Sequence, residues 1–464
     1  MRLVAEPREV TVAPRSVARL ARQVGPTRAV RLEQAADTVR QSMDGRRLWN
    51  LNSTAIGGGV AEMLELLVGY ARGVGVDAHW VVIDGDAAFF AVTKRLHNLL
   101  HGAVGDGGQL GAPEAAAYDA ILDANAAALR SRIAPGDVVV LHDPQTAGLV
   151  TAMTRLGAHV VWRCHIGTDR PNEHTRAGWD FLLPRLAECQ SYVFSHTAFV
   201  PAELAQQDVR IIEPSIDPLS PKNHRLPKDH IARLLARIGL IPGESRGPQS
   251  FVLGDGGPFS PTDRMVLQVS RWDYLKDMLG VLHGFAEHVA DRSDTRLALV
   301  GPSVAGVADD PEGAQVLTEC LKAWEELPHG PRSRIRLVAL PMDDVVANAL
   351  MVNASQRHAS VVVQKSLQEG FGLTVTEAMW KSRPVIASAV GGIVDQVPPG
   401  TGILLEDPAD LDLFGRTLRS LLADGAAMLQ LGRSARKQVR DHCLSDRHLV
   451  DYARLIAHVN SGQP

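Results

Sequence analysis

The sequence predicts an α/β protein with two domains, each a doubly wound parallel sheet covered by helices, that face a central cleft. Three observations favour this fold class. The chain has 464 residues, which is too long for one ordinary core. Short apolar runs recur along it, and each is followed by a turn and then a helical pattern. The series stops once, in a stretch rich in Pro, Gly and Ser, and then begins again.

Six apolar runs in the first half predict buried strands. Their apolar character is continuous rather than alternating, as in strands that are covered on both faces. Helical segments such as VAEMLELLVGYARGVG and AAAYDAILDANAAALRSRI lie between them, so parallel pairing is favoured. The expected strands cover residues 46–52, 78–85, 137–143, 159–167, 191–196 and 209–215.

A second series of six runs follows a linker that contains one helical piece, DHIARLLARIGL. Its expected strands cover residues 264–272, 296–303, 334–340, 360–366, 384–390 and 402–407. The resulting division of the chain is an N-terminal extension (1–45), a first domain (46–225), the linker (226–262), a second domain (263–440) and a C-terminal helix (441–464) that packs back on the first domain.

The composition is ordinary for a soluble globular protein, and a cytoplasmic location is expected. Apolar residues make up 45% and charged residues 22%, and the net charge of -4 gives no reason to expect a nucleic-acid partner. No window reaches the ~18 apolar residues of a membrane span, and the first residues lack the apolar run of a secretory signal. The four cysteines show no CxxC pairing, so reduced thiols are expected rather than disulfides or a zinc site.

A glycine triplet, Gly57, Gly58 and Gly59, follows the first expected strand and leads into a helix at about Val60. Glycine lets the backbone approach a ligand, and the N–H groups at a helix start favour a phosphate or hydroxyl oxygen. A plain flexible turn explains the triplet equally well. It is not the G-x-G-x-x-G fingerprint, which disfavours an NAD-dependent oxidoreductase.

Two cations, Arg271 and Lys276, follow the first strand of the second domain in SRWDYLKD. Ligands of open parallel sheets bind beyond the carboxyl ends of the strands. There, two cations could neutralise a diphosphate that gains charge as a leaving group. The alternative is a solvated pair of surface charges.

The stretch QKSLQEGFGLTVTEAMW combines a sharp turn with two carboxylates, Glu369 and Glu377. Gly370 and Gly372 permit the turn, so that amides near the helix start can point at phosphate or sugar oxygens. Glu377, one turn into the helix, could accept hydrogen bonds from two ribose hydroxyls, although a favourable helix dipole also explains a carboxylate there. Glu369 precedes the helix, and burying it unpaired would be costly.

These features together match a nucleotide-diphosphate sugar: glycines in one domain, and cations and two carboxylates in the other. The spacing Glu369-x7-Glu377, the pair Arg271/Lys276 and the early glycine loop resemble the retaining GT-B glycosyltransferases of the glycogen-synthase and sucrose-synthase superfamily. More narrowly, the following segments resemble the trehalose glycosyltransferring synthases: NSTAIGGGVAEML, VTKRLHNLLHG, HDPQTAGL, WRCHIG, EPSIDPLSPKN, QVSRWDYLKDMLGV and QEGFGLTVTEAMWKSRPVIASAVGGI.

The resemblance implies a GT-B architecture of two Rossmann-like domains and a cytoplasmic homodimer that moves glucose from an NDP-glucose to free glucose, giving α,α-trehalose. It implies catalytic roles for Arg271, Lys276, Glu369 and His165, although a histidine at a strand end is often only a structural residue. The substrate-binding residues that it implies are Gly57, Gly58, Gly59, Asn52, Asp143, Arg163, Gly370, Phe371, Gly372, Leu373, Thr374 and Glu377.

No tightly bound cofactor or metal is expected, with Mg²⁺ at most a stimulant. Asp84-Gly85-Asp86 has the D-x-D form that binds a metal in other glycosyltransferases, but a structural turn is the favoured interpretation. Gly167 stands where the family leads us to expect an aspartate, and 242–262 is longer than expected. The alternatives are a trehalose phosphorylase, another glucosyltransferase of the same fold, or a non-catalytic sugar-nucleotide sensor.

Overall fold

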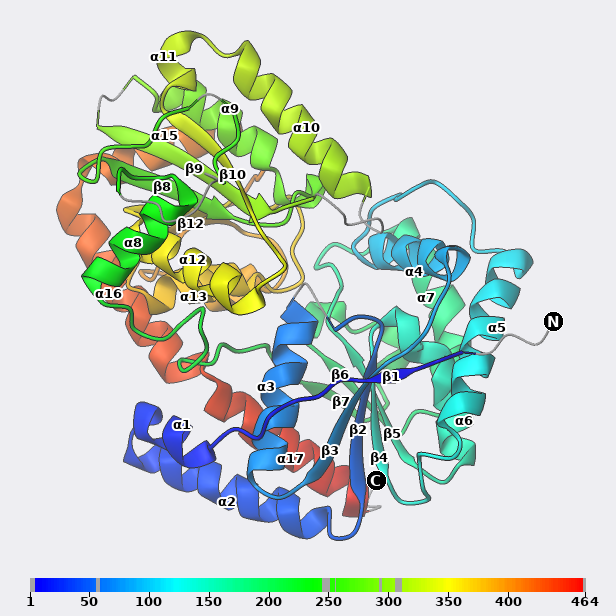
Figure 1. Ribbon diagram of the computed structural model, residues 1–464. Helices are drawn as coiled ribbons and strands as arrows, with labels where there is room; N and C mark the ends of the chain where they lie inside the picture. Colours follow the sequence, from blue (N-terminus) through cyan, green and yellow to red (C-terminus); the bar gives the residue numbers. More distant parts are fainter. Residues whose placement is uncertain are drawn as a thin grey trace. The chain divides into compact units, whose positions relative to one another are not determined.

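The computed structural model describes residues 5–55, 59–243, 251–254, 256–291, 294–304 and 311–461. The chain forms two compact units (Figure 1). The first unit runs to Ser215 and resumes at Ser445, and the second comprises Ile216–Leu444.

The sheet of the first unit has seven strands among the described residues, in the order β1-β3-β2-β4-β5-β6-β7. Every pair is parallel except β1 with β3, which are antiparallel. The strands are β1 (Arg8–Glu9), β2 (Arg47–Asn52), β3 (Asp77–Val82), β4 (Val138–His142), β5 (His159–Cys164), β6 (Ser191–Phe194) and β7 (Val209–Ile211).

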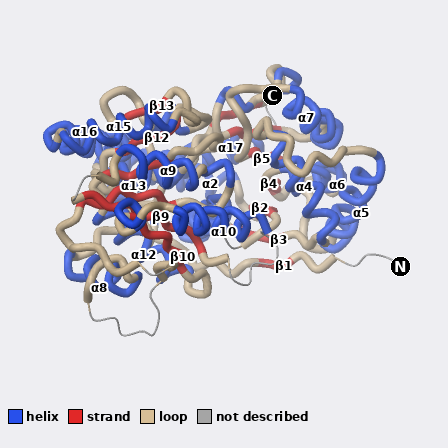
Figure 2. Tube along the Cα trace, turned by 90° about the horizontal axis from the view of Figure 1, so that it is seen from above, coloured by secondary structure: helices blue, strands red, loops and turns tan. Residues whose placement is uncertain are grey.

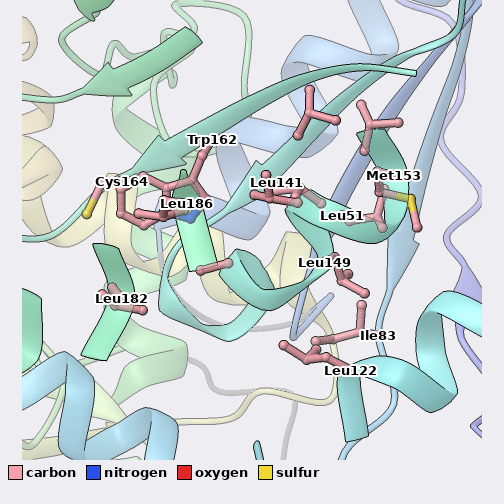
Figure 3. Close-up of a cluster of buried hydrophobic side chains, with 14 of the residues drawn as sticks. Leu51, Ile83, Leu122, Leu141, Leu149, Met153, Trp162, Cys164, Leu182 and Leu186 are labelled. Carbon is pink, nitrogen blue, oxygen red and sulfur yellow. The ribbon is translucent and has the colours of Figure 1, made fainter. Parts of the chain in front are cut away.

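Helices cover both faces of this sheet, because alternate residues within each apolar run point to opposite sides. On one face Leu51, Leu141 and Trp162 belong to a buried cluster with residues of α4 (Ala87–Leu100), α5 (Ala112–Leu129), the 3₁₀ helix η1 (Pro144–Leu149), α6 (Val150–Arg155) and α7 (Glu173–Leu186). Figure 3 shows part of this cluster, including Leu51, Leu141, Met153, Trp162 and Leu186.

The opposite face of the first sheet packs on α2 (Pro26–Ser42), α3 (Gly59–Gly73) and α17 (Ser445–Ser461). Strand residues such as Val140 and Val161 share this cluster with Leu455 and Ile456 of α17. The C-terminal helix is therefore an integral part of the first unit, and it also packs along α2. The remaining helices of this unit are α1 (Val17–Val24) and the 3₁₀ helices η2 (Thr197–Phe199) and η3 (Ala202–Leu204).

The second unit repeats the architecture with a sheet of six described strands, all parallel, in the order β10-β9-β8-β11-β12-β13. The strands are β8 (Arg264–Val269), β9 (Thr295–Pro302), β10 (Ile335–Leu340), β11 (Val361–Gln364), β12 (Val385–Ser388) and β13 (Ile403–Leu405). In Figure 2 these strands lie among helices. The helices are α8 (Lys228–Ile238), η4 (Tyr274–Lys276), α9 (Met278–His288), α10 (Pro311–Glu326), α11 (His329–Arg332), α12 (Val345–His358), α13 (Leu373–Trp380), α14 (Ile393–Gln396), α15 (Leu411–Ala423) and α16 (Gly425–His442).

The predicted fold class is confirmed, and each of the twelve expected strands is present, most of them shorter at the carboxyl end than their apolar run. Residues 1–45, expected as an extension, contain β1, α1 and α2, so much of this segment is built into the first unit. Two-residue β1 is too short to leave a pattern in the sequence. The expected linker 226–262 lies within the second unit and contains α8. No described helix has the length and apolar character that crossing a bilayer would require.

Candidate functional site

The strand order of each sheet reverses at one point, and the loops that follow the two strands there are where ligands of such sheets bind. In the second unit the reversal lies between the parallel neighbours β8 and β11. Arg271 and Lys276 follow β8, and Glu369 follows β11. The two loops are tied together, because the Leu367 amide donates to the Leu275 carbonyl over 2.8 Å.

Lys276 and Glu369 form an ion pair, with Nζ 2.8 Å from Oε2 and side chains that are only 15% and 11% exposed. Ser366 Oγ also donates to Glu369 Oε2, over 3.2 Å. Lys276 ends the 3₁₀ helix η4, which Asp273 caps: the Asp273 carboxylate accepts from the Leu275 amide at 2.8 Å. The cation and the carboxylate that the sequence placed 93 residues apart are thus direct partners.

Arg271 lies in the same loop but in a different environment. Its Nη2 contacts Asp273 Oδ2 at 2.9 Å, and its side chain is 46% exposed. Lys276 is therefore an enclosed ammonium held by Glu369, whereas Arg271 is a more accessible guanidinium.

A buried amide, that of Gln364 at the end of β11, joins the loops around this ion pair. Its Oε1 accepts from Thr374 Oγ1 at 2.9 Å, and its Nε2 donates to the hydroxyls of Ser270 and Ser366, both at 3.0 Å. The sequence interpretation missed Gln364. The signal was a polar residue at the end of the apolar run SVVVQ, where a buried amide needs polar partners.

The turn before α13 has the conformation that its glycines allow. Gly372 has φ +80° and is the residue from which α13 begins. The Phe371 carbonyl accepts from the Gln396 amide group, and the Gly370 carbonyl accepts from the Gly392 amide at 3.3 Å, so α14 and its start hold the turn. Phe371 is buried, whereas Leu373 and Thr374 keep part of their surface exposed. The predicted residues Gly370–Thr374 thus form one continuous turn that leads into α13.

Substituting Gly372 by alanine is expected to cost ~1–2 kcal/mol of folding stability and to lower activity as well. The left-handed conformation disfavours a Cβ by that amount, and the added Cβ would lie 3.1 Å from Glu369 Cγ. Gly400→Ala is a matched control, because Gly400 has φ +82° but no atom within 4 Å of its added Cβ. Thermal unfolding and turnover should show similar destabilisation in both variants and an activity loss in Gly372→Ala alone. Equal activities of the two variants would show that a Cβ added next to Glu369 does not affect turnover.

Glu377 lies in the second turn of α13 and is almost completely buried, at 2% exposure. Lys222 Nζ is 3.9 Å from its Oε1. The buried Lys381, one turn further along, donates to the Glu377 carbonyl at 3.1 Å and also to Asn223 Oδ1 and Gln356 Oε1. Burial lowers the pKa of Lys381, while the Glu377 carboxylate opposes that change. Glu377 is therefore buried, with Lys222 near its carboxylate and Lys381 bonded to its backbone carbonyl.

In the first unit the strand order reverses between β2 and β4. Gly59 is the first residue of α3, close to the expected helix start, while Gly57 and Gly58 lie outside the described residues. Asn52, at the end of β2, is buried with both ends of its amide in use: Oδ1 accepts from Trp80 Nε1 at 2.7 Å, and Nδ2 donates to the Thr54 carbonyl at 2.6 Å.

Asp143, Arg163 and His165 lie together at the ends of β4 and β5. The His165 amide donates to Asp143 Oδ1 at 2.7 Å, and the Asp143 amide donates to the Arg163 carbonyl at 2.8 Å. Asp143 has φ +64°, an unfavourable conformation for a residue with a Cβ. Burial raises the pKa of its carboxyl group to about 7, although the residue keeps part of its surface exposed.

The His165 ring is buried, and both of its nitrogens contact other side chains. Nε2 is 3.0 Å from His142 Nδ1, and Arg163 Nε donates to Nδ1 over 3.4 Å. Arg163 has no exposed surface, and its Nη2 donates to the Ile212 carbonyl at 2.6 Å. Burial lowers the pKa values of His142, to about 3, and of His165, well below its usual range, with the Arg163 charge acting in the same direction.

Two further sequence observations have local explanations. A Cβ at Gly167 would lie 2.4 Å from Phe199 Cγ, so an aspartate has no room there. In the D-x-D segment, Asp86 caps α4 by accepting from the Phe89 amide at 2.8 Å, and Asp84 Oδ1 accepts from the Gly85 amide at 3.0 Å. Both carboxylates serve the turn that the sequence indicated.

The buried histidines predict how the stability of the first unit depends on pH. His448 of α17 shares the strongly lowered pKa of His142 and His165, again through burial. In the unfolded chain these residues take up protons below pH ~6.5, whereas in the folded protein they do not, so stability falls as the pH falls below ~6.5. Each contributes a slope of up to ~1.4 kcal/mol per pH unit, and Asp143, with its raised pKa, acts in the opposite direction.

Replacing His448 by glutamine should remove one of these slopes. Urea unfolding between pH 4 and 6 is expected to show a dependence on pH that is shallower by ~1 kcal/mol per unit than in the unmodified protein. Identical slopes would show that His448 is protonated in the folded protein.

Comparisons with known proteins show which family the chain resembles. The family model "Trehalose synthase, N-terminal domain" matches residues 50–201, and "Glycosyl transferases group 1" matches residues 256–438. The chain is 35% identical over 415 residues to trehalose synthase of Rubrobacter xylanophilus, covering 89% of this chain and 90% of that protein. It is 32% identical to trehalose synthase of Pyrococcus horikoshii, covering 93% and 94%. Trehalose phosphorylase of Pleurotus pulmonarius is 28% identical over 84% of this chain, which spans 54% of that protein.

Solved structures share the fold. The E. coli structure described as trehalose-6-phosphate bound with UDP-2-fluoro glucose superposes with a TM-score of 0.66 at 13% identity, covering 90% of this chain and 100% of that one. Sucrose-phosphate synthase from Thermosynechococcus elongatus gives 0.64 at 15% identity, with the same coverage. With a full-length relative above one-third identity and this shared architecture, the chain belongs to the trehalose synthase family and is a trehalose-related glycosyltransferase with the GT-B fold.

Proposed function

We propose that the protein is a retaining glucosyltransferase that moves glucose from an NDP-glucose to free glucose, reversibly, and forms α,α-trehalose. The observation that carries the proposal is the ion pair Lys276–Glu369 beside Arg271, at the reversal point of the second sheet. Relatives named trehalose synthase, which match the chain along nine-tenths of its length, support the choice of reaction.

In this proposal Lys276 and Arg271 bind the diphosphate. Lys276 is held by Glu369 with little exposed surface, and a charge in such an enclosed site acts more strongly on a leaving group than it would in water. Arg271, half-exposed, supplies planar donors that suit phosphate oxygens. Glu369 faces the transferred glucose, and the amides of the turn Gly370–Thr374 lie around its hydroxyls.

Glu377 would bind the ribose hydroxyls of the donor. A carboxylate accepts hydrogen bonds from two vicinal hydroxyls, and the Lys222 ammonium lies 3.9 Å from Glu377 Oε1. In the first unit we assign Gly57–Gly59, Asn52, Asp143, Arg163 and His165 to the sugar side. Asn52 and Arg163 would act by shaping the site, because the Asn52 amide and the Arg163 Nε and Nη2 groups bind the protein.

The proposed transfer is a same-face attack on the anomeric carbon. The C–O bond to the diphosphate breaks while the acceptor oxygen bonds the same face, and a phosphate oxygen takes the acceptor proton. No carboxylate nucleophile is required, which distinguishes this from double displacement. The protein then acts by positioning the two sugars and stabilising the departing charge.

The direct test is incubation of the protein with glucose and, separately, ADP-, UDP- and GDP-glucose. A non-reducing disaccharide that trehalase cleaves to glucose is the expected product with at least one donor. Binding of every sugar nucleotide without any product would instead identify a sensor.

A phosphorylase is the second candidate, since fungal trehalose phosphorylases match 84% of this chain. It would convert trehalose and inorganic phosphate to glucose and glucose 1-phosphate. Formation of glucose 1-phosphate without any nucleotide would favour it over the proposed synthase.

Turnover is expected to persist after dialysis against EDTA. Arg271 and Lys276 supply the positive charge for the diphosphate, and the D-x-D carboxylates are occupied by backbone amides. Added Mg²⁺ should change the rate only modestly. Complete loss of activity with EDTA, restored by Mg²⁺, would contradict the assignment of these cations.

A further inference from the structure

Four buried polar side chains in the first unit form a single-file chain of hydrogen bonds. Arg163 Nε contacts His165 Nδ1 at 3.4 Å, His165 Nε2 contacts His142 Nδ1 at 3.0 Å, and His142 Nε2 contacts Asn50 Oδ1 at 3.2 Å. Asn50, His142 and Arg163 belong to the parallel neighbours β2, β4 and β5, and His165 directly follows β5. His142 pairs with Arg163 in the strand register. None of the four residues is more than 9% exposed.

The two imidazoles lie with their ring planes only 9° apart and their centroids 5.3 Å apart. The bonded ring nitrogens are 3.0 Å apart, much closer than the ring centroids. The two rings therefore meet edge to edge, as an in-plane hydrogen bond requires. The contact is therefore a directed bond between the rings rather than a face-to-face stack.

The donor and acceptor roles in all of these hydrogen bonds follow from Arg163. A guanidinium only donates hydrogen bonds, so His165 Nδ1 must accept and carries no proton. The proton of neutral His165 is then on Nε2 and is donated to His142 Nδ1, which leaves the His142 proton on Nε2 for Asn50 Oδ1. Turning the Asn50 amide around would reverse the His142 bond and force a proton onto His165 Nδ1, against a donor.

A charged form of either histidine is disfavoured for the same reasons. A second proton on His142 or His165 would turn one bond of the chain into a contact between two donors, beside the fixed positive charge of Arg163. Other ionisable groups near these side chains include His448, Tyr452 and Arg447 of α17, with the Arg163 guanidinium 5.8 Å from the Tyr452 ring centroid. Cys164 and Asp143, whose carboxylate accepts from the His165 amide, are also nearby.

We propose that Asn50, His142 and Arg163 form a positioning relay that holds His165 as its neutral Nε2–H tautomer. This rests on the proposed function only in that His165 lies near the reacting sugar. Both ring nitrogens of His165 are used inside the protein, so the imidazole neither takes nor gives a proton during transfer. The role of His165 is to fix the segment that follows β5. Asn50 and His142 act on the sugar only through His165.

The tautomers can be measured in the full chain by long-range ¹H–¹⁵N correlation with ¹⁵N-labelled histidine, with signals assigned by His142→Gln and His165→Gln. Both residues are expected as the neutral Nε2–H form from pH 8 to pH 5. An Nδ1–H tautomer or an imidazolium at either position would overturn the relay. This readout does not depend on activity, so it separates failure of the relay from failure of the proposed function.

A kinetic test uses Asn50→Asp. A carboxylate next to His142 Nε2 favours a second proton on that ring, which makes its contact with His165 donor to donor. We expect turnover to fall ~10-fold to ~100-fold as His165 shifts, with a new loss of activity towards acid pH, while the KM for the donor stays within about twofold.

Asn125→Asp is the matched control. Asn125 is another fully buried asparagine of the first unit, but its side chain bonds the backbone of Asp84 and Ile121 and no histidine. This variant should lose stability without the new loss of activity towards acid pH. If the pH profiles of the two variants coincide, the relay does not position His165. Should Asn50→Asp fail to fold, the tautomer measurement on the unmodified protein decides alone.

Discussion

Replacing Lys276 by alanine is expected to lower turnover by ~100-fold or more, the scale seen when one donor to a developing oxyanion is removed. Lys276 is the enclosed cation of the site, 15% exposed and 2.8 Å from Glu369. Its charge would act on the diphosphate most strongly as that group departs, so kcat should fall more than the KM for the donor rises. Steady-state kinetics with the donor identified by product formation measure both values.

The alanine variant also leaves Glu369 without its ammonium partner, so a second variant is needed to separate the two effects. If Lys276 served only to neutralise Glu369, the double variant Lys276→Ala/Glu369→Gln would be as active as Glu369→Gln alone. We expect it to be clearly less active than Glu369→Gln, because the missing ammonium also stabilises the leaving group. Lys228→Ala is the control, since Lys228 is an exposed lysine of the same unit at the start of α8. Near-normal turnover of Lys276→Ala would reject its role.

Replacing Lys365 by methionine is expected to destabilise the second unit by ~3 kcal/mol, at the lower end for breaking a buried ion pair. Lys365 directly follows β11, has no exposed surface, and donates its Nζ to Asp277 Oδ2. Methionine preserves much of the packing but leaves the Asp277 carboxylate, 18% exposed, without its cation. The midpoint of urea unfolding, followed by a probe in the second unit, measures the loss.

A second substitution at the partner should restore most of this stability. Asp277 has φ +47° and caps α9 through the Gly280 amide at 3.0 Å. Asparagine tolerates that conformation and keeps the capping oxygen, but it carries no charge. We expect Lys365→Met/Asp277→Asn to be clearly more stable than Lys365→Met alone. Additive losses would mean that the two side chains do not interact in solution.

The sequence by itself determined the fold class and the parts of the chain from which the site is built. Continuous apolar runs followed by helical patterns are sufficient to mark parallel strands, because such strands are buried on both faces. The segments that follow the carboxyl ends of those strands then indicated Arg271, Lys276, Glu369 and the glycine turn as site residues. This was possible because the place of a motif along a βα unit fixes where it lies relative to the sheet. Periodicity also placed Glu377 within the helix that follows the turn.

Only the tertiary structure decided which side chains meet. The ion pair Lys276–Glu369 and the pair Lys365–Asp277 join residues roughly ninety positions apart, and their contact depends on β8 and β11 being neighbours in the sheet. The chain from Arg163 to Asn50 depends likewise on the register of three strands. Hydrogen bonds and ion pairs act over a few ångströms, whereas sequence patterns report burial and period but not strand order. For that reason His165 could be named from the sequence, while the tautomer that its neighbours impose could not.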